Sequence, residues 1–131
     1  MPTVIAPASL APARGYSNGM VLSGSRVLFV AGQIGWDREA KLVSSDLTAQ
    51  FAQALDNVLA VVREAGGAPE HVGRLTIYVT DKRRYLAAAK AIGVAYRERM
   101  GKHYPAMALV EVKDLLEDGA LVEIEATAVL P

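Results

Sequence analysis

Two stretches of this chain are apolar on both faces of an extended strand, and this feature constrains the fold more than any other. Residues 26–34 and residues 106–112 are rich in valine, leucine and phenylalanine, and Pro105 suits the entry to the second stretch. Alternate side chains of a strand point to opposite faces. On the first stretch, one face carries Val27, Phe29 and Ala31 and the other Leu28, Val30 and Ile34; on the second, one face carries Met107, Leu109 and Glu111 and the other Ala106, Ala108, Val110 and Val112. Both strands therefore need cover on both sides.

Two segments have the apolar spacing of helices. The first begins at Ser45 or Asp46 and ends at Gly66-Gly67, and the second runs from about Arg84 to Met100 after a cap at Asp81. Further strands are predicted over residues 16–22, 72–80 and 121–130, and Asp118-Gly119 is typical of a hairpin turn before the last of them. Residues 1–15, with three prolines, are expected to be an extended lead-in.

This order of strands and helices predicts an α+β fold. Residues 1–131 are interpreted as a single two-layer domain with a mixed β-sheet and both helices on one face, because right-handed crossovers place them there. Two helices leave the other sheet face bare, although strands 26–34 and 106–112 are apolar on that face as well. Large exposed apolar patches mark interfaces, so we expect a homo-oligomer with the bare faces buried between subunits.

Composition argues against several classes of partner. Fourteen basic and fourteen acidic residues give a formal charge of zero, so the electrostatic signature of a nucleic-acid-binding protein is missing. No run approaches the roughly 20 apolar residues of a membrane helix, and the N-terminus does not resemble a signal peptide. The chain has no cysteine, and its two histidines, His71 and His103, form no metal motif. We expect a cytoplasmic protein without a cofactor or a metal.

The last strand places two carboxylates on the face opposite its apolar residues. Glu123 and Glu125 alternate with Val122, Ile124 and Ala126. Carboxylates are rarely buried without a partner. Two interpretations stay open: both glutamates lie at a wet rim or pair with arginine, or one of them lines an intersubunit pocket as a general acid or base.

Several short motifs occur in an order that resembles one known family. They are Gly15-Tyr16-Ser17-Asn18-Gly19, Phe29-Val30-Ala31-Gly32-Gln33-Ile34, Leu55-Asp56-Asn57-Val58, Tyr104-Pro105-Ala106 and Val122-Glu123-Ile124-Glu125-Ala126. The chain is similar, from about residue 16 to residue 130, to the RidA/YjgF family of imine and enamine deaminases, also called L-PSP endoribonucleases. The resemblance implies a chorismate-mutase-like fold and a homotrimer with ligand clefts between subunits.

The resemblance also implies a site for hydrolysis of unstable imines to carbonyl compounds and ammonia. Tyr16 takes the position of a tyrosine that closes the cleft, and Glu123 that of a glutamate that positions or activates water. The family's substrate-binding arginine falls at Met107, which cannot form a guanidinium–carboxylate pair. Substrate-binding positions are expected at Met107, Ala31, Gln33, Trp36, Leu109 and Arg14, the last as a partial replacement for the missing arginine.

Three functions remain open from the sequence. The first is an imine or enamine hydrolase with an altered substrate, because Met107 argues against ordinary 2-aminoacrylate deamination. The second is a non-catalytic trimer that binds a small metabolite. The third, an endoribonuclease or translation inhibitor, is the least favoured because the chain has no net positive charge. Met107 and Trp36 also have plainer interpretations, as core filling and as a packed surface aromatic.

Overall fold

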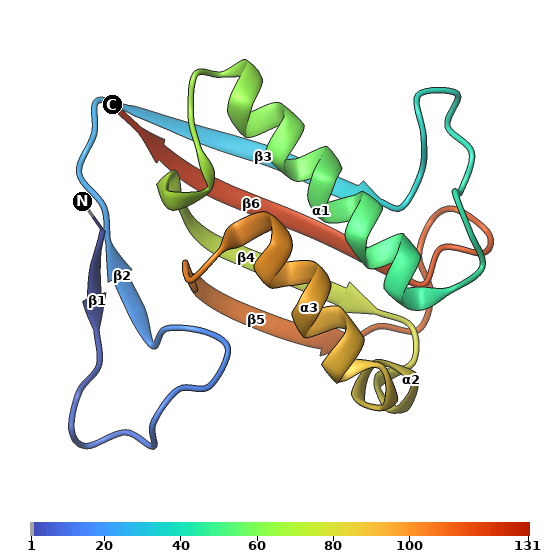
Figure 1. Ribbon diagram of the computed structural model, residues 1–131, viewed down its shortest axis with the longest axis horizontal. Helices are drawn as coiled ribbons and strands as arrows, with labels where there is room; N and C mark the ends of the chain where they lie inside the picture. Colours follow the sequence, from blue (N-terminus) through green and yellow to red (C-terminus); the bar gives the residue numbers. More distant parts are fainter. Residues whose placement is uncertain (1) are drawn as a thin grey trace.

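The computed structural model describes residues 2–131, and Met1, the first residue of the predicted lead-in, lies outside them. The elements, in chain order, are β1 (Thr3–Ile5), β2 (Gly19–Val21), β3 (Arg26–Ile34), α1 (Leu47–Glu64), the 3-10 turn η1 (Pro69–His71), β4 (Val72–Val79), α2 (Lys82–Ala87), α3 (Ala89–Met100), β5 (Ala106–Glu111) and β6 (Val122–Leu130). The fold is α+β, as predicted. Figure 1 shows α1 and α3 lying across one face of the main sheet, with β1 and β2 forming an arm at one side.

The main sheet is mixed, with strand order β3-β6-β4-β5. β6 is antiparallel to both of its neighbours, and β5 is parallel to β4. The predicted hairpin before the last strand is therefore wrong. β4 lies between β5 and β6, and the Asp118-Gly119 turn belongs to a loop that crosses the end of β4. That loop is fixed to β4 at both ends, because Val112 N–H donates to the Val79 carbonyl (2.8 Å) and Thr80 N–H donates to the Leu121 carbonyl (3.2 Å).

The first helix forms as predicted. The Asp46 carboxylate accepts a hydrogen bond from Ala49 N–H (3.0 Å), which satisfies a donor that the helix itself leaves free. Beyond the last turn, Gly66 adopts φ +89°, a conformation that favours glycine. The apolar stripe of α1 is buried, and its members are Leu47, Phe51, Leu55, Val58, Leu59 and Val62.

The second predicted helix is two helices. Asp81 accepts hydrogen bonds from Arg83 and Arg84 N–H, so α2 begins at Lys82 instead of Arg84. At Ala88 the backbone leaves helical geometry (φ −95°, ψ 4°), and α3 then starts in a different direction (Figure 1). The residues at the break are alanines, which carry no signal for a break.

The lead-in also differs from expectation. Thr3, Val4 and Ile5 favour extended structure, and they pair with β2 as an antiparallel ribbon. β2 is shorter than the predicted strand over residues 16–22. Ser17 fixes this arm to the entry of β5: its N–H donates to the Pro105 carbonyl (3.1 Å) and its hydroxyl to the Tyr104 carbonyl.

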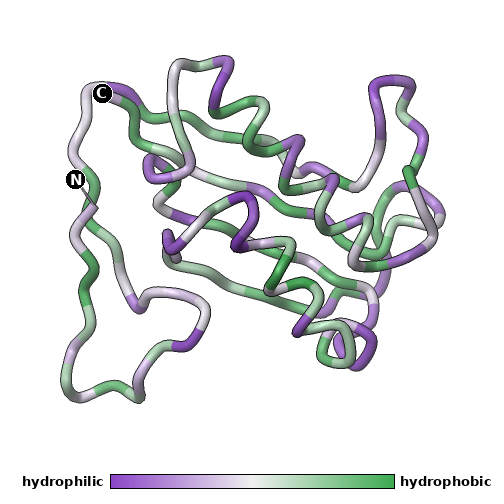
Figure 2. Tube along the Cα trace, in the orientation of Figure 1, coloured by the Kyte–Doolittle hydropathy of each residue, from purple (hydrophilic) through white to green (hydrophobic). Residues whose placement is uncertain are grey.

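The core lies between the helices and the sheet. Alternate residues of β4 and β6 are buried there, including Leu75, Ile77, Ile124 and Ala126, and α1 and α3 supply the other side. Figure 2 shows hydrophobic residues along the strands and α1, with hydrophilic residues gathered in the loops.

The opposite face of the sheet is uncovered in the single chain, as predicted. Phe29 is 78% exposed and Val27 59%, while Val30 on the same strand is buried in the core. Ala108 and Val110 of β5 are also exposed.

Candidate functional site

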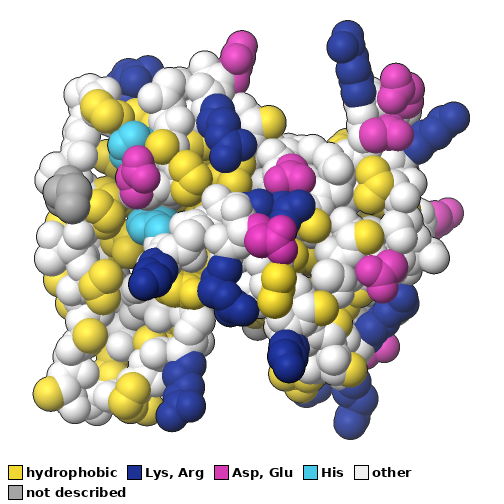
Figure 3. Space-filling view, in the orientation of Figure 1, with side chains coloured by type: hydrophobic (Ala, Val, Ile, Leu, Met, Phe, Trp, Pro, Cys, Tyr) yellow, Lys and Arg dark blue, Asp and Glu magenta, His cyan; other side chains and the backbone are white. Residues whose placement is uncertain are grey.

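A pocket of about 580 Å³ lies where α3, the entry to β5 and the N-terminal arm meet. Its volume is in the range of small-molecule sites. Figure 3 shows a notch between the arm and the helices in this region, bordered by Lys and Arg side chains. The lining residues are Arg14, Gly15, Phe51, Ile77, Tyr85, Ala89, Ile92, Gly93, Tyr96, Arg97, Tyr104 and Met107.

Met107 reaches this pocket because of the strand register. It pairs with Leu75 of β4, which is buried beneath the helices, and residues paired across a sheet share a face. Met107 is half-buried and packs against the core. The position that the resemblance assigns to a substrate-binding arginine therefore forms an apolar part of the pocket wall.

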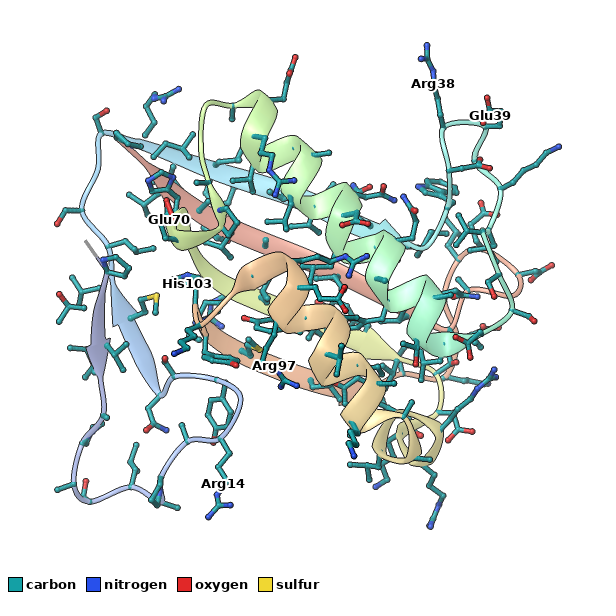
Figure 4. All side chains as sticks on the ribbon, viewed as in Figure 1. Arg14, Arg38, Glu39, Glu70, Arg97 and His103 are labelled. Atoms are coloured by element: carbon teal, nitrogen blue, oxygen red, sulfur yellow. The ribbon has the colours of Figure 1, made fainter. Side chains whose placement is uncertain are left out.

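Two exposed arginines supply the positive charge at the rim of the pocket. Arg14 and Arg97 line it, and no carboxylate does. In Figure 4, Arg97 projects from α3 and Arg14 from the loop before β2, with the Arg14 guanidinium directed outward. The pocket can therefore attract an anion. Sequence reasoning identified Arg14 and missed Arg97.

An aromatic pair forms another wall of the pocket. The rings of Tyr96 and Tyr104 stack with centroids 5.4 Å apart. The Tyr96 hydroxyl donates to the His103 carbonyl (2.6 Å), and burial raises the Tyr96 pKa, so Tyr96 is neutral near pH 7. The His103 ring nitrogen Nε2 lies 2.7 Å from the Val72 carbonyl, so His103 fastens the α3–β5 loop to β4.

Glu123 lies on the other face of the sheet. It pairs with Tyr78 of β4, whereas Met107 shares a face with Leu75. Its carboxylate packs over Gly32, where a Cβ atom would lie 2.3 Å from Oε2. Gly32 sits in the β3 bulge between Val30 and Gln33, and a side chain there would have to displace the Glu123 carboxylate.

A second carboxylate lies beside Glu123 on that face. The Tyr78 hydroxyl donates to Glu125 Oε1 (2.7 Å). This hydrogen bond, followed by partial burial and the charges of Glu125 and Glu123, raises the Tyr78 pKa.

The other predicted site residues are dispersed in the single chain. Tyr16 is 41% exposed and lines a separate pocket within the N-terminal arm, and Leu109 is 38% exposed. The Gln33 amide donates to the Ala31 carbonyl (3.2 Å), so it is used locally. The Trp36 carbonyl accepts a hydrogen bond from Asn57 (3.0 Å), which also bonds the Ile34 carbonyl (3.1 Å). Of the predicted residues, the structure brings only Arg14 and Met107 into one pocket.

The described chain contains neither a metal-binding cluster nor a helix that could span a membrane. Residues 2–131 contain no group of three or more His, Asp or Glu side chains arranged to hold a metal ion. None of the helices in that range is long and apolar enough to cross a membrane.

The fold and the pocket define a small two-layer α+β protein with a ligand-sized, cationic pocket at the edge of its sheet. The family model described as endoribonuclease L-PSP matches residues 6–130. The chain is 36% identical over 124 residues to a 2-iminobutanoate/2-iminopropanoate deaminase of Salmonella typhimurium, covering 95% of this chain and 91% of that one.

Solved structures agree with the family match. The Rid-family protein YyfB from Yersinia pestis superimposes with a TM-score of 0.87 at 34% identity, covering 98% of both chains. The YjgF protein of Escherichia coli superimposes with a TM-score of 0.68 at 33% identity, covering 95% of this chain and 92% of that one. This chain belongs to the RidA/YjgF family, whose model carries the name endoribonuclease L-PSP.

Proposed function

We propose that this protein is a RidA-like homotrimer that binds a small metabolite and hydrolyses an imine or enamine to a carbonyl compound and ammonia. The observation that carries the proposal is the pocket at Met107, which combines two arginines with apolar and aromatic walls. A relative covering nearly the whole chain is named a 2-iminobutanoate/2-iminopropanoate deaminase, which supports this reaction class.

The chemistry needs a bound imine and an activated water. Water adds to the carbon of the C=N bond, the amine nitrogen gains protons, and ammonia leaves as the carbonyl forms. Glu123 is the proposed group that orients or activates the water, and Tyr16 the group that closes the cleft. Because Met107 and Glu123 lie on opposite faces of one sheet, they can serve one ligand only if Glu123 acts in a neighbouring subunit's cleft.

The exposed apolar face supports assembly. Phe29 and Val27 on β3 and Val110 on β5 are all more than one third exposed in the single chain. These residues lie on the two edge strands, and Glu123 and Glu125 of β6 lie between them on the same face. Exposed apolar side chains at both edges favour burial against a partner. The proposed trimer would bury them and bring the Glu123 side of one subunit toward another subunit.

Ordinary 2-aminoacrylate deamination is expected to be weak. An arginine–carboxylate pair that loses one partner costs on the order of 2–5 kcal/mol, which is tens-fold or more in substrate binding. Met107→Arg should therefore raise hydrolysis of the imine derived from 2-aminoacrylate, and Glu123→Gln should lower it.

The experiment is an assay of ammonia or 2-oxo acid released from enzymatically generated 2-aminoacrylate, with wild-type protein and these two variants. Arg14→Ala tests whether the arm already supplies a substitute cation. Activity that Glu123→Gln leaves unchanged contradicts the role of the glutamate. If neither the wild type nor any variant hydrolyses this imine although a 2-oxo acid still binds, the result favours the alternative function, a non-catalytic trimer that binds a small metabolite. The absence of the arginine at Met107 is consistent with that alternative.

An RNA substrate is not favoured by the charge. The formal net charge is zero, so few counterions would be released on binding a polyanion. We expect negligible association with RNA at physiological salt.

A further inference from the structure

Arg97 and Arg99 lie two residues apart on α3 and have different surroundings. All three nitrogen atoms of the Arg99 guanidinium donate hydrogen bonds within the chain. Its Nε and Nη2 atoms donate to the two carboxylate oxygens of Asp56 at 2.8 and 3.3 Å, and Nη1 donates to the Ala95 carbonyl. This is the one ion pair among residues 2–131. Arg97 is instead an exposed residue that lines the pocket and has no carboxylate partner in the described chain.

The Arg97 side chain lies against Gly93. Residues four apart on a helix are neighbours on its surface, and a Cβ atom added at Gly93 would lie 3.3 Å from Arg97 Nη1 and 4.0 Å from Cζ and Nη2. The guanidinium thus rests over the glycine, and both residues line the pocket. A side chain at position 93 would occupy the edge of that space.

The pocket walls indicate which group the ligand carries in addition to its anionic group. Tyr104 and Met107 lie on the strand side, and Ile77 and Phe51 line the pocket from the core. Apart from the Tyr104 hydroxyl, these groups are apolar and offer no partner to a second charge. At about 580 Å³ the pocket has room for an apolar side chain in addition to a carboxylate.

We propose that Arg97 of α3 binds the carboxylate of the ligand, and that the pocket accepts 2-oxo and 2-imino acids whose apolar side chain rests on Met107 and Tyr104. The anion-binding group is thus on the helix, and position 107 on β5 serves the apolar end of the ligand. Arg14, across the pocket on the arm, is a weaker contributor because a residue on a loop loses more conformational freedom on binding. This assignment rests on the proposed function in taking this pocket as the ligand site.

Calorimetric binding of 4-methyl-2-oxopentanoate tests the assignment without requiring turnover. Its primary amide is the matched neutral probe. Arg97→Ala should lower the affinity for the acid about tenfold or more, because it removes a hydrogen-bonded charge pair with the carboxylate. Affinity for the amide should stay unchanged, and Arg97→Lys should restore part of the affinity for the acid. Pyruvate, which lacks the larger apolar group, should bind more weakly than 4-methyl-2-oxopentanoate to the wild type.

Gly93→Ala separates binding from folding. Alanine is the better helix former, so this variant should unfold at a Tm a few degrees higher. The added methyl would lie 3.3 Å from Arg97 Nη1, so the guanidinium has to shift by a few tenths of an ångström and acid binding should weaken less than in Arg97→Ala. Arg83→Ala, which removes an exposed arginine of α2 outside the pocket, is the charge-matched control and should bind like the wild type.

Three results overturn the assignment: acid affinity unchanged in Arg97→Ala, an equal loss for acid and amide, or no binding of the acid to wild type at millimolar concentration. Failure of the proposed function is distinguishable. Binding that depends on Arg97 in a protein that hydrolyses no imine refutes the catalytic proposal and leaves this assignment standing. Imine hydrolysis at an unchanged rate in Arg97→Ala refutes this assignment and leaves the catalytic proposal standing.

Discussion

Replacing Gln50 with leucine should destabilise the protein more than any conservative change on the surface of α1. Gln50 is fully buried in the first turns of that helix. Its side-chain Nε2 donates to the carbonyls of Ser44 (2.9 Å) and Gly119 (3.0 Å), and its Oε1 accepts from Leu121 N–H (2.8 Å). One side chain thus connects α1 to the loop that leads into β6 and Glu123.

The magnitude follows from those three hydrogen bonds. In Gln50→Leu the Leu121 N–H loses its acceptor, which costs about 1–3 kcal/mol for a buried donor. The two carbonyls lose a donor each, at about 1 kcal/mol apiece. The leucine regains about 1 kcal/mol from its extra apolar surface. The net loss is about 2–4 kcal/mol, a large share of the roughly 5–15 kcal/mol that stabilises a typical domain.

The measurement is urea unfolding at one fixed protein concentration, because the midpoint of the proposed trimer would depend on concentration. Gln53→Leu is the matched control: Gln53 is half-buried on the same helix and bonds only the Asn57 side chain (2.9 Å). We expect the control to lose under about 1 kcal/mol. A loss of the same small size in Gln50→Leu would refute the reasoning, since the network would then contribute no more than a surface amide.

Three further predictions concern alkaline stability, assembly and close packing. Burial raises the pKa of Tyr96, so above a tyrosine's ordinary pKa of about 10 the unfolded chain ionises first and the free energy of unfolding falls as pH rises. Tyr96→Phe loses the hydrogen bond to the His103 carbonyl and should be less stable than the wild type at pH 8. In urea unfolding, its free energy of unfolding should fall less than that of the wild type between pH 8 and about pH 11. Phe29→Lys places a charge on the bare apolar face and should shift sedimentation at micromolar concentration from trimer to monomer, whereas an unchanged trimer would contradict burial of that face. Gly35→Ala brings a Cβ within 2.6 Å of the Gln50 Cα, so thermal unfolding should show a loss of about 1–3 kcal/mol, and an unaltered Tm would mean that the backbones move apart freely.

The elements that the sequence predicted well are those whose signals are local. β3 occupies its predicted range because alternating apolar residues and the turn before Arg26 define it without reference to other strands. α1 begins after its capping Asp46 for the same kind of reason. The break at Ala88 and the pairing of residues 3–5 have no such signal, because both depend on what the segments pack against.

The candidate site was less predictable because it depends on strand order. Periodicity shows that Met107 and Glu123 each alternate with their neighbours, but only the pairing of β5 and β6 with β4 relates the two faces. Arg97 was overlooked because helix prediction from sequence relies on the apolar positions, and Arg97 is not one of them. Its signal was present in the sequence as a glycine four residues earlier, which leaves room for a long side chain to fold back.

The position of Glu123 connects the catalytic proposal to the assembly. A single sheet separates its carboxylate from the pocket lined by Met107 and Arg97. In an isolated subunit, the proposed anion-binding pocket and the proposed water-activating group therefore cannot reach the same small ligand. If Glu123 acts in hydrolysis, it acts on a ligand held by a neighbour, and any variant that dissociates the trimer without unfolding it must lose turnover. The same variant keeps Arg97 over Gly93, because that contact lies within one helix. Binding of 2-oxo acids and hydrolysis of imines therefore respond differently to dissociation, and retained turnover in a folded monomer would exclude Glu123 from the reaction.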